Sequence, residues 1–238
     1  MHRFPPALPH GELDEVFGDV FFVSGMMKTV LLNADWQFSR NMTVVRDGES
    51  LTLINSVRLD EHGLASLERL GHVTNVVRIC ALHGRDDAFY TARYGATFWS
   101  IPGVQHDHGL RSHKALTESG EMPFRGCSVF AFRTSKRPEA VIRVERAGGI
   151  LVSGDTLQNW GAPDAFFSDA SRETMTGMGF FRSTNIGPLW MHLNEPRPDD
   201  FARLREIEYR HVLPGHGQPV LDTANAAYSA AFERLFAV

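Results

Sequence analysis

The sequence predicts an α/β protein in which helices cover the faces of β-sheets. Short aliphatic runs come first, and in both halves of the chain such runs then alternate with amphipathic helical segments. The 238 residues contain no internal repeat, low-complexity tract or flexible linker. We therefore expect a single domain over residues 1–238.

The opening hairpin is the clearest local signal. The runs 41–46 and 50–55 are rich in residues that favour strands, and the Asp47-Gly48 pair between them is typical of a tight hairpin turn. An earlier strand is predicted at 20–23.

A helix and a buried strand follow the hairpin. Leucines recur on one face of the segment 61–70, and Gly71 is a suitable stop for the helix they predict. The run 73–82 is rich in β-branched residues and predicts a buried strand. A short helix at 89–94 and a strand at 97–100 complete this half.

The second half repeats the alternation of strands and helices. The run 149–154 predicts a strand that delivers Asp155 at its end. An amphipathic helix is predicted over 198–209, with two aspartates in its first turn where the helix dipole favours them. The other elements expected here are strands at 128–132, 141–145 and 211–213 and a last helix at 223–236.

The composition excludes several classes of function. Charges number 24 basic and 28 acidic, a net charge of −4, so there is no clustered positive field for nucleic acid or anionic lipid. No segment approaches the ~20 apolar residues of a membrane helix, and the first residues lack a secretory pattern. Two cysteines, Cys80 and Cys127, make no disulfide framework, and Cys80 is expected to be a buried, inert thiol. We therefore expect a cytoplasmic protein.

Metal-capable side chains directly follow three predicted strands. They are His83 with Asp87, then Asp155, then His216. Strand ends in layered α/β proteins gather at one edge, where imidazole and carboxylate groups can bind zinc, iron or manganese. The alternative is that each caps a turn, although a histidine in Pro-Gly-His-Gly is poorly suited to that role.

Four stretches together resemble the metallo-β-lactamase fold superfamily. They are NMTVVRDGESLTLINSVRL, LGHVTNVVRICALHGRDDAFY, GGILVSGDTLQNW and HVLPGHGQPV. The last two carry the motifs typical of the family's bridging aspartate and last metal-binding histidine. The resemblance implies a four-layer αββα sandwich with a metal site at the edge of its two sheets. It also implies metal-assisted hydrolysis as the ancestral chemistry.

The metal loop departs from the family pattern. Where the family reads H-x-H-x-D-H, this chain keeps His83 and Asp87 and has Arg85 and Ala88 in place of two histidines. The family's further histidine, usually in Gly-His-Thr, has no equivalent in residues 122–132. Three other histidines are candidate substitutes, but a solvated loop is the favoured interpretation; they are His106, His108 and His113.

The surviving positions imply a depleted metal site. Asp87, Asp155 and His216 make three ligands, enough with water for one divalent ion, zinc first and iron or manganese as alternatives. His83 with a share of Asp155 is too little for a second ion. If the site no longer binds a metal ion, no cofactor is expected.

Asp87 and Arg85 are the candidate catalytic residues. Asp87 could orient water or carry a proton, and Arg85 could stabilise developing negative charge or replace the missing cation. The alternative for Arg85 is a structural pair with Asp86 or Asp155.

The sequence thus favours metal-assisted hydrolysis of a small ester, lactone, thioester or phosphoester. The alternative is a non-catalytic protein that binds a small molecule or partner on the same fold; an iron-dependent redox relative is a weaker third. The aromatic-rich segment 160–190 is expected to form helix core or a dimer surface, with the wall of a binding pocket as the alternative. A homodimer is the default expectation.

Overall fold

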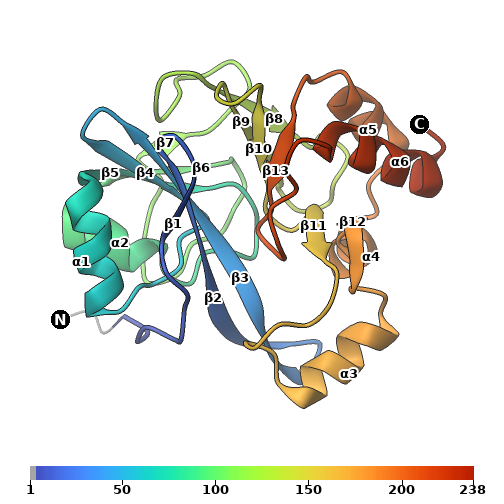
Figure 1. Ribbon diagram of the computed structural model, residues 1–238, viewed down its shortest axis with the longest axis horizontal. Helices are drawn as coiled ribbons and strands as arrows, with labels where there is room; N and C mark the ends of the chain where they lie inside the picture. The colour runs from blue at the N-terminus through green and yellow to red at the C-terminus, as the bar shows by residue number, and fades with distance from the viewer. Residues whose placement is uncertain (1–3) are drawn as a thin grey trace.

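Two β-sheets face each other in the computed structural model, which describes residues 4–238 (Figure 1). In these residues one sheet has seven strands in chain order, β1 to β7. The other has four, in the order β13-β10-β9-β8, and β11 and β12 form a separate pair. The strands are β1 (Asp14–Phe17), β2 (Val20–Leu31), β3 (Ala34–Asp47), β4 (Ser50–Ile54), β5 (His72–Arg78), β6 (Thr97–Ser100), β7 (Lys114–Ala115), β8 (Cys127–Ala131), β9 (Ala140–Val144), β10 (Ile150–Val152), β11 (Leu157–Trp160), β12 (Arg182–Ile186) and β13 (His211–Leu213).

The core between the sheets is mostly aliphatic. Val45 and Val77 of the seven-stranded sheet pack in one cluster with Ile142 and Leu213 of the four-stranded sheet. These side chains are fully buried, as expected when two apolar sheet faces meet. Burial of this shared face holds the two halves of the chain together.

Helices cover the outer face of each sheet. The helices of residues 4–238 are α1 (Glu61–Leu70), α2 (Asp87–Tyr94), α3 (Asp169–Gly177), α4 (Pro188–Asn194), α5 (Pro198–Arg205) and α6 (Ala224–Phe236). Leu64 of α1 and Tyr90 of α2 pack on the seven-stranded sheet, and Phe201 of α5 and Phe232 of α6 pack on the other. Figure 1 shows the resulting layers, helices on the left and right and two sheets between them. The predicted αββα sandwich is thereby confirmed.

Several predicted elements have the expected bounds. The helix 61–70 and the strands 97–100 and 211–213 are confirmed residue for residue. The predicted strand 73–82 is too long, because β5 ends at Arg78. There the Arg78 side chain folds back to donate to the carbonyl oxygens of Cys80 and Ala81, and the chain leaves the sheet.

The β2–β3 hairpin extends much further than predicted. The two strands pair from Val20 to Leu31 and from Ala34 to Val45. Polar residues interrupt the apolar pattern in this extension, so the predicted strands covered only its base. In Figure 1 the hairpin reaches past the rest of its sheet towards α3. No helix within residues 4–238 is long and apolar enough to cross a membrane.

Candidate functional site

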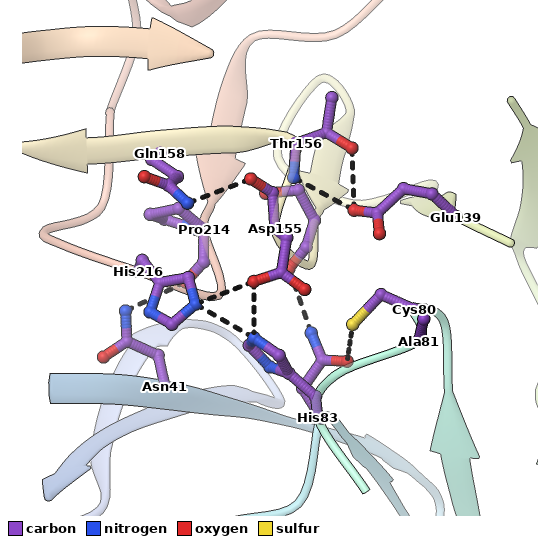
Figure 2. A network of polar contacts seen from close by, with 12 residues as sticks. Asn41, Cys80, Ala81, His83, Glu139, Asp155, Thr156, Gln158, Pro214 and His216 are labelled. Carbon is purple, nitrogen blue, oxygen red and sulfur yellow. Dashed lines mark hydrogen bonds and ion pairs between the residues drawn. The ribbon is translucent and has the colours of Figure 1, made fainter. Parts of the chain in front are cut away.

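Three of the sequence-predicted metal ligands touch one another at the edge of the sheets (Figure 2). His83 Nε2 lies 3.2 Å from Asp155 Oδ1 and 3.0 Å from His216 Nε2, and His216 Nε2 lies 3.1 Å from Asp155 Oδ1. All three side chains are nearly buried. They follow β5, β10 and β13, so the convergence joins one sheet to the other. We call these three residues the His-Asp-His cluster.

Glycines allow these segments to approach so closely. A Cβ atom on Gly215 would lie 2.6 Å from the carbonyl oxygen of Gly154 and 3.0 Å from His83 Cε1, so a side chain there would push the cluster apart. Gly217 has φ +87°, a left-handed conformation that glycine adopts without strain. Glycine is thus favoured beside His216 for two different physical reasons, close approach at Gly215 and backbone conformation at Gly217.

Two buried polar side chains hold the cluster in place. Asn41 Nδ2 donates to the carbonyl oxygens of Pro214 and Gly217, at 2.9 and 2.7 Å, and so fixes the loop that carries His216. Glu139 Oε1 accepts from the backbone N–H and the hydroxyl of Thr156, at 3.0 and 2.7 Å, directly after Asp155. Burial and the nearby Asp155 raise the pKa of Glu139 well above its usual range. Sequence reasoning singled out neither residue, because Asn41 lies within a predicted strand and Glu139 lies outside the four stretches that carry the resemblance.

The environment favours protonation states suited to a metal. Burial would raise the pKa of Asp155, but His83 and His216 hold the pKa of this carboxyl well below its usual value. Burial lowers the pKa of His83, and Asp155 offsets only part of that effect. An ionised carboxylate and a neutral imidazole are the forms that bind a divalent ion.

The geometry also fits one tetrahedral ion. Ligand atoms at zinc–ligand distances of ~2.0–2.1 Å and tetrahedral angles are ~3.3 Å apart, close to the separations in the His-Asp-His cluster. His216 Nδ1 donates to the carbonyl oxygen of Ser39 at 3.0 Å, and this contact orients the ring with its Nε2 towards the cluster. The Cys80 Sγ is within 4.8 Å of ligand atoms on His83 and Asp155, but burial raises the pKa of this thiol well above its usual range.

Asp87 is placed differently from the other predicted ligands. It begins α2, is fully buried, and its Oδ1 accepts from the Ser56 hydroxyl at 2.6 Å. Its Oδ2 has no partner among the described residues, and no hydrogen bond or ion pair there joins it to the cluster. Burial raises the pKa of Asp87 to about 6. The structure thus brings His83, rather than Asp87, together with Asp155 and His216.

Arg85 pairs with Asp86, as in the structural alternative. Its Nη1 donates to Asp86 Oδ1 at 2.6 Å, and its Nη2 donates to the carbonyl oxygen of Pro6 at 2.8 Å. The other Asp86 oxygen accepts from the Arg40 guanidinium and from the Arg58 backbone N–H. Arg40, which the sequence analysis did not single out, is buried and lines the same cavity as the cluster.

A cavity lined mainly by apolar and aromatic side chains opens above the cluster. Met27, Trp36, Phe38 and Arg40 line it from the β2–β3 hairpin. The strand alternation puts residues 36, 38 and 40 on one face, a signal that was available in the sequence but fell outside the predicted strand. The rest of the lining comes from the cluster itself and from residues that include Leu82, Gln158, Trp160, Met175, Phe180, Leu189 and Trp190.

The segment 160–190 therefore supplies a wall of this cavity, the alternative that the sequence analysis ranked second. The same side chains also pack together, since Trp160, Met175 and Phe180 share a buried cluster.

The candidate substitute histidines contact other parts of the chain. His106 and His113 hydrogen-bond to Ser100 and to the Phe98 backbone, and His108 packs against Phe4.

Comparisons with known proteins find similarity in structure alone. No family model matches the chain, and no curated protein matches its sequence. A metallo-β-lactamase from Erythrobacter litoralis is similar at 15% identity and TM-score 0.59, covering 97% of this chain and 96% of that one. The FIM-1 metallo-β-lactamase from Pseudomonas aeruginosa, in a mono-zinc form, is similar at 14% identity and TM-score 0.59, covering 97% of each chain. DIM-1 metallo-β-lactamase gives 14% identity and TM-score 0.61, over 96% of this chain and 98% of that one.

Proposed function

We propose that this chain, which has the metallo-β-lactamase fold, is a metal-dependent hydrolase with a single-ion site. One divalent ion, zinc first, would be held by His83, Asp155 and His216. The observation that carries the proposal is the mutual contact of three metal-capable side chains from three separate segments. The FIM-1 structure in its mono-zinc form supports the idea that this fold can hold one ion.

The residues of the chain have distinct parts in this function. A divalent ion in such a site supplies Lewis acidity and lowers the pKa of water towards ~7. The Ser39 carbonyl keeps the His216 ring in one tautomer, and Glu139 fixes the turn that presents Asp155. The apolar cavity would bind the substrate and exclude bulk water, which strengthens electrostatic interactions there. The substrate classes proposed are small esters, lactones, thioesters and phosphoesters.

Metal content is the decisive measurement. The protein is purified without a histidine tag, and zinc, iron and manganese are measured by elemental analysis. We expect about one equivalent per chain, lost in His83→Ala, Asp155→Ala and His216→Ala. Absence of metal in the wild-type protein, even after incubation with each ion, would overturn the proposal. A panel of esters, lactones, thioesters and phosphodiesters then tests hydrolysis by the loaded protein.

Two further variants sharpen the result. His62→Ala removes an exposed imidazole and should leave the metal content unchanged. Asp87→Ala distinguishes the two candidate ligand sets, which share Asp155 and His216 and differ in whether Asp87 or His83 is the third ligand. Retention of the metal supports the set that contains His83, whereas loss of the metal in Asp87→Ala but not in His83→Ala would favour the set expected from the sequence motif.

A non-catalytic binding protein is the second candidate. The observation that favours it is the replacement of two family histidines by Arg85 and Ala88, with Arg85 paired to Asp86. In that case the His-Asp-His cluster is a hydrogen-bonded structural unit, and the cavity binds a ligand without reaction. A metal-free wild-type protein with a folded, ligand-binding cavity would support this candidate.

A further inference from the structure

Arg40 occupies an unusual position in the cavity wall. It lies on β3, is only 2% exposed, and lines the same cavity as His83, Asp155 and His216. Burial of a permanent positive charge is costly unless that charge is compensated. An arginine here therefore needs a negatively charged or accepting partner. The hydrogen bonds of Arg40 show which partners the protein supplies.

The protein compensates this guanidinium only in part. One nitrogen of Arg40 pairs with Asp86, while its Nε and Nη1 are buried without a partner. Asp86 is shared, because it also accepts from the Arg85 guanidinium and the Arg58 backbone N–H. Two arginine side chains thus share the Asp86 carboxylate, and two of the Arg40 donors stay buried without a hydrogen-bond partner.

Other buried polar atoms without a partner belong to residues that line the same cavity. Within residues 4–238, ten buried side-chain polar atoms lack a partner, and five of these belong to residues that line this cavity. Besides the two Arg40 nitrogens and His83 Nδ1, they are the indole N–H of Trp190 and the amide oxygen of Gln158. Arginine and indole nitrogens can only donate, so donors predominate and favour a ligand rich in acceptor oxygens.

We propose that Arg40 determines specificity by binding the anionic group of a small organic monoanion, a carboxylate attached to an apolar body. The guanidinium of Arg40, which shares its carboxylate partner with Arg85, matches one further carboxylate, and the aromatic lining matches the apolar body. The assignment of this anion as a hydrolase substrate rests on the proposed function. Anion binding itself does not, so the two can be tested separately.

The test compares a carboxylic acid with its neutral amide on metal-free protein. Isothermal titration calorimetry measures binding of 4-phenylbutyrate and 4-phenylbutyramide after treatment with EDTA. We expect the carboxylate to bind at least about tenfold more tightly, with this preference abolished in Arg40→Gln and partly retained in Arg40→Lys. Arg111→Gln, which removes an exposed arginine, should keep the preference of the wild-type protein.

Equal dissociation constants for the two probes, or no binding of either, would overturn the inference. So would an unchanged preference in a folded Arg40→Gln protein. If that variant fails to fold, the wild-type comparison of acid with amide still decides, because it needs no substitution. Since no metal is present, a failure here leaves the metal measurement untouched, and a protein without metal can still show the carboxylate preference.

Discussion

At the scale of single residues, the ionisation of the Asp87 carboxyl group gives a direct test through protein stability. It is fully buried, and its only side-chain hydrogen bond in the described residues is to Ser56. Its pKa is raised from 3.8 to about 6, with burial as the main cause, against the opposing effect of Arg78 and Arg40. The folded protein therefore binds this proton more tightly than the unfolded chain does.

The sign of the pH effect follows from that difference. The contribution of Asp87 to the free energy of unfolding is largest below pH ~4 and falls by up to about 3 kcal/mol as the pH rises through 6. Asp87→Asn cannot ionise, so metal-free Asp87→Asn should match the wild-type protein near pH 4 and exceed its stability at pH 7.5. Urea unfolding at the two pH values measures this.

A matched control is available on the hairpin. Asp35→Asn changes an exposed carboxylate to the same amide and should not reproduce the gain in stability. Lower stability of Asp87→Asn than of the wild-type protein at pH 7.5 would contradict the prediction. It would mean that Arg78 and Arg40 stabilise the ionised carboxylate by more than burial disfavours it.

At the scale of elements, α3 contributes to the cavity wall, and the residue that precedes it caps the helix. The Ser168 hydroxyl accepts from the Ser171 backbone N–H at 3.2 Å, as a helix N-cap. The Ser171 hydroxyl in turn accepts from the Gln37 backbone N–H of β3 at 2.8 Å, and Met175 of α3 lines the cavity. The cap therefore supports both the helix and its attachment to the hairpin.

Removal of this cap should weaken the protein measurably. We expect Ser168→Ala to lower the free energy of unfolding by about 1 kcal/mol and the melting temperature by roughly 2–4 °C. Thermal unfolding followed by circular dichroism measures the change. Ser168→Asp, which restores an accepting oxygen, should recover stability, and Ser119→Ala in an exposed loop should have little effect. Equal stability of Ser168→Ala and Ser168→Asp would show that the cap contributes nothing.

At the scale of the whole molecule, the His-Asp-His cluster ties the two sheets together. One of its members follows β5 of the seven-stranded sheet, and the others follow β10 and β13 of the four-stranded sheet. An ion held by all three would bind the folded chain far better than the unfolded one. Ligand binding and global stability are then linked.

Metal addition should therefore raise the melting temperature. At free zinc about 100 times the dissociation constant, the expected stabilisation is about 2.7 kcal/mol, or roughly 5–10 °C for a chain of this length. Differential scanning calorimetry with zinc and with EDTA measures the shift. His216→Ala should abolish it and His62→Ala should retain it; an equal shift in both variants would place the zinc somewhere other than the cluster.

The amino-acid sequence was enough to predict the layered fold and the meeting of Asp155 with His216. Alternating apolar patterns and turn residues are local, so the helix 61–70 and the strands 97–100 and 211–213 could be predicted accurately. The confirmed resemblance to metallo-β-lactamases supplied the layer order that local patterns lack. Strand ends at one edge then predicted that Asp155 and His216 would lie close together.

Which side chain joins Asp155 and His216, and which residues support them, depends on contacts that form only in the folded chain. Asn41 holds the loop of His216 from 176 residues away, and Arg40 reaches Asp86 across 46 residues. Such contacts depend on how the long β2–β3 hairpin crosses the edge of the sandwich, and no local pattern encodes that crossing. For the same reason Asp87, a ligand by motif, is turned towards Ser56, while Arg40, which lies in no motif, faces the cavity.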